Sequence, residues 1–134
     1  LMAYQFSTAA RNAWLDAIET TVGVSPTLEI RTGAAPANCA AAATGTVLAT
    51  MTLPSDWMAA AASGSKALSG TWQDASADAA GTAGHFRINA GATCHIQGTV
   101  TATGGGGDMT LDSVSIAASQ QVTITAFTLT AGGA

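Results

Sequence analysis

Charged side chains are scarce in this sequence. Only 9% of its 134 residues are charged, against about 25% in an average soluble domain. Four Lys and Arg residues stand against eight Asp and Glu residues, which gives a net charge of −4 at pH 7. Nucleic-acid binding and electrostatic attachment to an acidic membrane both need a basic surface, so the composition argues against both partners.

Long apolar runs and cysteines are also few. No stretch reaches about 18 apolar residues without an interruption, so no segment is expected to span a bilayer. Residues 1–25 lack the basic region and the continuous apolar region of a secretory signal. The two cysteines, Cys39 and Cys94, lie far apart and form no CxxC motif. We expect both to be free thiols in a reducing cytoplasm and not bonded to each other.

Recognisable catalytic motifs are missing. The sequence has no HExxH, GxSxG, P-loop or GxGxxG pattern. The four glycines at 104–107 are followed by Asp108, whereas a P-loop continues with Lys and then Ser or Thr. We therefore expect no catalytic residues and no cofactor.

The His, Cys and Asp residues form no metal-ligand pattern. Cys94 and His95 are neighbours in a predicted strand and point to opposite faces, so they cannot easily share a zinc ion. His85 and His95 are expected to be ordinary surface imidazoles. The aspartates lie in loops or at strand ends, without the converging oxygens of a calcium loop, and no metal site is expected. These aspartates are Asp74, Asp78, Asp108 and Asp112.

One segment has the periodicity of a helix. From Trp14 onward, large apolar residues recur at helical spacing, and alanines between them favour a helix. A Ser-Thr pair in front of it can cap its first turn. Gly23 suits the position that ends a helix, and Pro26 forbids its continuation. The pattern predicts a helix over residues 7–22.

After the helix the apolar residues alternate, which indicates β-strands. The clearest pattern is a hairpin with its turn at 90–92. The apolar phase of the last strand shifts, which predicts a bulge near Ala126. The hairpin residues expected to face one core are Phe86, Ile88, Cys94, Ile96 and Val100. The predicted strands are residues 27–31, 46–53, 66–73, 84–89, 93–101, 109–112 and 121–130.

Short strands separated by turn signals predict a mainly β fold, an antiparallel β-sandwich or jelly roll with one N-terminal α-helix. The whole chain, 1–134, is expected to form a single domain, with an arm at 1–6, the helix at 7–22 and the β-sandwich at 27–131. Much of the hydrophobic 48% is alanine, so the core is small for a lone monomer. Burial in an assembly would add stability.

Three of the few aromatic residues are tryptophans. Filling the core is one role for each of them. Contact with another subunit is the alternative, because Trp is enriched at interface hot spots. The uncharged arm is expected to pack against a neighbouring chain. The candidate subunit-interface residues are Met2, Tyr4, Phe6, Trp14, Trp57 and Trp72.

Five segments, in order, resemble a set of small virion proteins of tailed bacteriophages. The segment LDAI, within the predicted helix, is similar to the helical opening typical of that set. Within the set, the chain most resembles capsid cement or decoration proteins, including one of a short-tailed phage. The five segments are LEIRTGAAPA (28–37), GTVLATMTL (45–53), GTAGHFRI (81–88), HIQGTVTATGGGGDMTL (95–111) and SIAASQQVTITAFTLTAG (115–132).

The resemblance implies a structural virion protein that sits on the capsid surface after assembly in the host cytoplasm. Its implied partners are the major capsid protein, whose neighbouring subunits it bridges, and other copies of this chain in a dimer or trimer. The family carries no catalytic residues. A tail- or fibre-associated module is the alternative function, and there Trp57 or Trp72 beside Asp74 would stack on a sugar.

Overall fold

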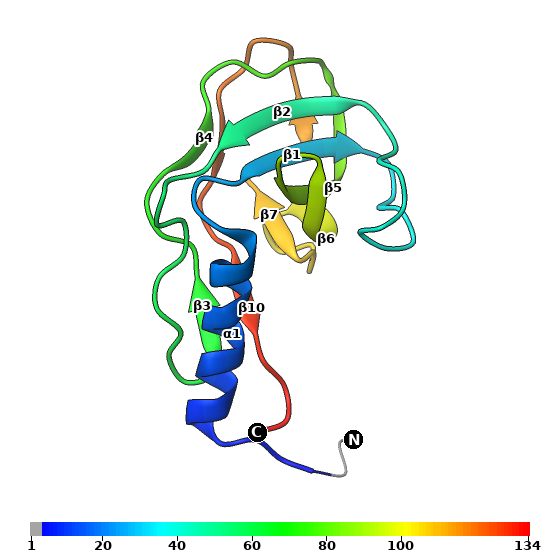
Figure 1. Ribbon diagram of the computed structural model, residues 1–134. Helices are drawn as coiled ribbons and strands as arrows, with labels where there is room; N and C mark the ends of the chain where they lie inside the picture. Colours follow the sequence, from blue (N-terminus) through cyan, green and yellow to red (C-terminus); the bar gives the residue numbers. More distant parts are fainter. Residues whose placement is uncertain (1–3) are drawn as a thin grey trace.

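The structure, a computed structural model, describes residues 4–134. A curled sheet forms one end of the molecule and a narrower stalk forms the other (Figure 1). The stalk consists of helix α1 (Thr8–Val22) beside strands β3 (Ser65–Ala67) and β10 (Thr128–Thr130), which pair antiparallel. The predicted mainly β class with one N-terminal helix is confirmed.

The curled sheet has the strand order β2-β1-β5-β6-β7, and β8 pairs with β5. Its pairs are antiparallel except β6 and β7, which are parallel. A separate antiparallel pair, β4 with β9, packs beside the edge strands β2 and β7, so both edges are covered. The strands are β1 (Thr27–Thr32), β2 (Val47–Thr52), β4 (Trp72–Asp74), β5 (Gly81–Ala90), β6 (Thr93–Ala102), β7 (Met109–Leu111), β8 (Ser115–Ile116) and β9 (Val122–Ile124).

The hydrophobic core lies between the curled sheet and the β4–β9 pair. The sheet contributes alternate residues of β1 and β5, and the β4–β9 pair contributes Trp72 and Ile124 from the other side. The core residues from β1 and β5 are Leu28, Ile30, Phe86 and Ile88, all of which are fully buried. Apolar side chains on facing layers thereby exclude water from both.

Helix α1 begins and ends as its sequence signals predict. The Ser7 hydroxyl accepts a hydrogen bond from the Ala10 amide at 3.1 Å, which satisfies a free donor of the first turn. Gly23 follows the helix with φ 91°, and its amide donates to the Glu19 carbonyl at 2.9 Å. The predicted helix at 7–22 is confirmed, with Ser7 as its cap.

The predicted hairpin is also confirmed as β5 and β6, but it contains a bulge that the alternation pattern does not reveal. Ile88 pairs with Ile96 and Asn89 pairs with Cys94, so His95 between them has no partner. The extra residue reverses the orientation of Cys94, so Cys94 lies on the outer face of the sheet together with its partner Asn89. The prediction that Cys94 faces the core is wrong for this reason.

Two predicted strands each divide in two. Residues 66–73 form β3 and β4, with a turn between them at Gly70, whose φ is 73°. Residues 121–130 form β9 and β10, and Ala126 bridges to Thr110 at the point where a bulge was predicted. In both cases the first and second halves belong to different pairs, because the chain passes between the sheet region and the stalk at these points.

Polar contacts hold α1 to the rest of the stalk. Lys66 on β3 is 3% exposed, and its Nζ lies 2.6 Å from Asp16 Oδ1 and 3.5 Å from Glu19 Oε2 on the helix. The same Asp16 oxygen accepts a hydrogen bond from the Ala61 amide at 2.9 Å, and Asn12 Oδ1 accepts one from the Gly64 amide at 2.9 Å. These partners of the buried Lys66 ammonium offset the cost of removing its charge from water.

Asp16 should make the stability of the chain depend on pH. Its hydrogen bonds with Lys66 and with the Ala61 amide hold the pKa of this carboxyl below its usual 3.8. Because the folded-state pKa is depressed, the stabilisation is complete above about pH 3.8 and is lost as the pH falls through the lowered value. We expect Asp16→Asn to be less stable than the natural chain at pH 7, with the gap closing in acid.

Thermal unfolding at a series of pH values measures this gap. Asp56→Asn, at an exposed aspartate, is the matched control and should show no gap at any pH. A gap between Asp16→Asn and the natural chain that stays constant down to the lowest pH at which both fold would contradict the assignment.

Candidate interaction surface

Each charged side chain of helix α1 contacts the rest of the protein, although that of Asp16 remains 49% exposed. Asp16 and Glu19 contact Lys66, and Arg11 Nη1 donates to the Ala131 carbonyl at 3.4 Å. A surface helix of a globular protein normally has its charged side chains on the solvent side. The exposed residues of α1 are all uncharged: Thr8, Ala9, Ala10, Ala13, Trp14, Ala17, Thr20 and Thr21.

Aromatic side chains extend this uncharged surface to the arm. Tyr4 is 64% exposed and Trp14 is 49% exposed, while Phe6 is half-buried between them. The ring centroids of Tyr4 and Phe6 lie 5.4 Å apart and those of Phe6 and Trp14 lie 6.0 Å apart, both edge to face. The three rings thus form one exposed cluster at the start of the helix.

The arm also contacts the C-terminal segment of its own chain. The Phe6 amide donates to the Gly133 carbonyl at 2.6 Å, and Gln5 Nε2 donates to the Ala134 carbonyl at 3.1 Å. Residues 4–6 of the arm therefore have partners within their own chain, and packing of the arm against a neighbouring chain stays a prediction. Met2, the remaining arm residue proposed for an interface, lies outside the described residues.

A shallow apolar hollow of about 250 Å³ lies along the helix beside the cluster. Its walls are Trp14, Ala17, Ile18, Thr21 and Val22, and His95 from the hairpin stands at its rim. We call the exposed aromatic cluster and this hollow together the helix face. It combines exposed rings with a concave surface that carries no charged side chain.

Trp57 and Trp72 lie in the core, and their assignment to a subunit interface is wrong. Both are 0% exposed. The Trp57 indole N–H donates to the Gly23 carbonyl at 2.9 Å, and the Trp72 indole N–H donates to the carbonyls of Trp57 at 3.1 Å and Ser69 at 3.2 Å. Because each N–H has an internal acceptor, complete burial costs no hydrogen bond. A sugar cannot stack on either ring.

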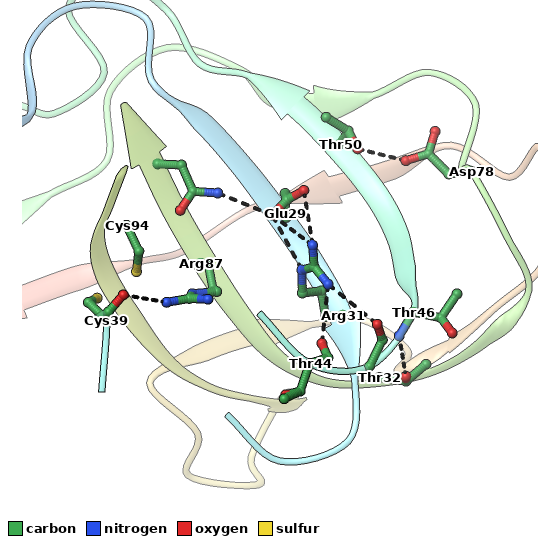
Figure 2. A network of polar contacts seen from close by, with 12 residues as sticks. Glu29, Arg31, Thr32, Cys39, Thr44, Thr46, Thr50, Asp78, Arg87 and Cys94 are labelled. Atoms are coloured by element: carbon green, nitrogen blue, oxygen red, sulfur yellow. Dashed lines mark hydrogen bonds and ion pairs between the residues drawn. The ribbon is translucent and has the colours of Figure 1, made fainter. Parts of the chain in front are cut away.

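A second feature lies on the outer face of the sheet, under the connection between β1 and β2. This connection, residues 33–46, folds back over the sheet and is called the cover loop here (Figure 2). Arg87 Nη2 donates to the Cys39 carbonyl at 2.7 Å, and Arg31 Nη1 donates to the Thr44 carbonyl at 3.2 Å. Side chains of the sheet thereby satisfy carbonyl groups of the loop.

Two further side chains of the hairpin hold the start of the cover loop. His85 Nδ1 lies 2.9 Å from the Gly33 carbonyl, and Gln97 Nε2 donates to the Pro36 carbonyl at 2.7 Å. His85 is 0% exposed, so the prediction that it is a surface imidazole is wrong. Alternation alone does not reveal this polar layer, because it marks the outward residues of a strand as solvent-facing, whereas a loop distant in sequence covers them here.

A cavity of about 410 Å³ lies between the cover loop and the hairpin. The Glu29 carboxylate at its wall accepts from Arg31 at 3.2 Å and from Asn89 at 3.1 Å, so its charge is already paired. Cys39 and Cys94 also line this cavity as free thiols. Within residues 4–134, no three His, Cys, Asp or Glu side chains come close enough together to hold a metal ion.

Every basic side chain of the chain is engaged within the chain. Arg11 and Lys66 bind the stalk, and Arg31 and Arg87 bind the cover loop. Lys66 and Arg87 are also buried. An association that depends on basic side chains would first have to break these contacts.

No family model, curated protein or solved structure matches this chain. The resemblance to cement proteins of tailed phages therefore stays a prediction. In the described part of the chain, α1 is the only helix, and it lacks the length and apolarity needed to cross a bilayer.

Proposed function

We propose that this protein is a non-enzymatic structural protein of a virion, a capsid cement or decoration protein. It binds the major capsid protein lattice through the helix face and bridges neighbouring subunits. The observation that carries the proposal is the surface of helix α1 around exposed Trp14, close to exposed Tyr4, where the exposed residues are uncharged and the charged residues of the helix are engaged with the rest of the protein.

The physical argument concerns what such a surface gains on binding. Exposed aromatic rings contribute large apolar contact areas, and truncating them usually weakens an interface most. An uncharged helix face can be buried without desolvating a charge. Because the contact is apolar, its strength should change little with salt. A subunit that binds the assembled shell and not its dissociated parts stabilises the shell by mass action.

Adding a charge to the helix face should weaken binding without unfolding the chain. Ala17 is exposed, and glutamate is a good helix former, so Ala17→Glu should keep the helix. Burying that carboxylate in an apolar contact should weaken binding to shells by about tenfold or more. Co-sedimentation of the purified chain with stripped shells, at low and high salt, measures the effect.

Ala118→Glu adds the same charge at an exposed alanine between β8 and β9, and it should bind as the natural chain does. Circular dichroism checks that both variants fold. Equal binding by Ala17→Glu and the natural chain would exclude the helix face as the contact surface.

The location in the particle is tested separately. Densitometry of purified particles should give a copy number comparable with that of the major capsid protein. Particles without this protein should release their genome at a lower temperature, and added protein should restore the difference. A few copies per particle, with unchanged heat stability, would favour a tail- or fibre-associated module instead.

A further inference from the structure

The two cysteines, far apart in sequence, meet on the outer face of the sheet. Cys39 lies in the cover loop, and Cys94 lies on β6 beside the bulge at His95 (Figure 2). The Arg87 guanidinium fixes the loop at this point through its 2.7 Å hydrogen bond to the Cys39 carbonyl. Both thiols line the same cavity, and both are half-buried.

Two features of the fold produce this meeting. The bulge turns Cys94 from the core to the outer face, and the carbonyl contacts of the cover loop bring Cys39 down onto that face. Burial and the adjacent Cys94 thiol raise the pKa of Cys39 to about 11. Figure 2 shows the Cys94 side chain pointing toward the segment that carries Cys39.

We propose that Cys39 and Cys94 are a redox site that closes to a disulfide when the chain meets a disulfide oxidant such as glutathione disulfide. In a reducing compartment the pair stays open as two thiols. The disulfide joins the cover loop to the β5–β6 hairpin by a covalent bond and so holds the loop on the outer face of the sheet.

The chemistry is two thiol–disulfide exchanges. One cysteine thiolate attacks a sulfur of glutathione disulfide, which forms a mixed disulfide and releases one glutathione thiolate. The second cysteine thiolate attacks the cysteine sulfur of that mixed disulfide, forms the Cys39–Cys94 bond and releases the second glutathione thiolate. The cysteines lose two electrons, glutathione disulfide gains them, and the released thiolates take up the two protons that the cysteines lost.

The surroundings of Cys39 should make closure of the disulfide slow. At neutral pH this thiol is mostly protonated, so closure should be slow and should accelerate as the pH rises toward 11. Closure also constrains a long segment of the unfolded chain, which stabilises the fold.

The experiment incubates the purified full-length chain with glutathione disulfide under native conditions. We expect the thiol count of the denatured chain to fall from two to zero. The mass should decrease by two hydrogen atoms, and peptide mapping should join Cys39 to Cys94. The melting temperature should rise by about 5 °C or more, and added reductant should reverse the shift.

Cys39→Ser and Cys94→Ser are the matched controls. Each keeps one thiol and should end with one bound glutathione, with no gain in melting temperature. Two stable glutathione adducts on the natural chain, disulfide-linked dimers, or two thiols unchanged after prolonged oxidation at pH 9 would each overturn the proposal.

Discussion

Trp72→Ala is expected to lower the free energy of unfolding by about 3–5 kcal/mol. The side chain is 0% exposed, and its ring centroid lies 6.0 Å from that of Trp57 and 5.6 Å from that of Phe127. Alanine would leave a cavity at the centre of the core and would remove the donor that serves two backbone carbonyls. The free energy of unfolding of a typical domain is about 5–15 kcal/mol, so this substitution should remove a large part of it.

Trp14→Ala is the control for this substitution, because the residue type and the size change are the same. Trp14 is 49% exposed and contacts Phe6 alone among the rings. Its replacement should cost about 1 kcal/mol or less. Urea unfolding followed by circular dichroism measures both variants. Similar losses for the two would mean that the roles assigned to these tryptophans are wrong.

The second large effect is expected from Gly84→Ala. A Cβ atom at Gly84 would lie 2.2 Å from the Gly33 carbonyl oxygen and 2.8 Å from the Gly33 amide nitrogen. Both atoms belong to the backbone of the cover loop, so the loop must move away, and the contact between Gly33 and His85 is lost with it. We expect a destabilisation of about 2–3 kcal/mol, near the upper end for overpacking.

Gly132→Ala is the matched control, because nothing lies within 4 Å of a Cβ at that position. It should change stability by about 0.5 kcal/mol or less. In Gly84→Ala, the amides of residues 33–46 should exchange their hydrogens faster than in the natural chain. Exchange that is unchanged there, in a variant that is nonetheless destabilised, would contradict the clash with Gly33.

Local signals were enough to predict the helix and the hairpin. The caps at Ser7 and Gly23 and the turn at 90–92 act within a few residues, so their physics can be read from adjacent positions. The divided strands depend instead on distant partners. Residues 66–73 have a continuous strand pattern, yet β3 pairs with β10 in the stalk while β4 pairs with β9 beside the sheet.

The candidate surfaces were predictable only in part. Composition indicated that Trp residues either fill a core or form an interface, but it could not separate Trp14 from Trp57 because both occur in alanine-rich segments. Tertiary packing decides this. The approach of Cys39 to Cys94 could not be predicted either, since it needs the single unpaired residue at His95 and a loop held by carbonyl contacts.

All four Lys and Arg side chains make contacts within the chain, and this also affects how copies of the chain interact with one another in solution. The exposed aspartates Asp56, Asp78, Asp108 and Asp112 give the outer surface an anionic character, and none of the Lys or Arg side chains is exposed. Near neutral pH such surfaces repel each other weakly at a net charge of −4 per chain. As the pH approaches the isoelectric point of about 4.6, this repulsion vanishes while the uncharged helix face remains exposed, so colloidal stability should be lowest there.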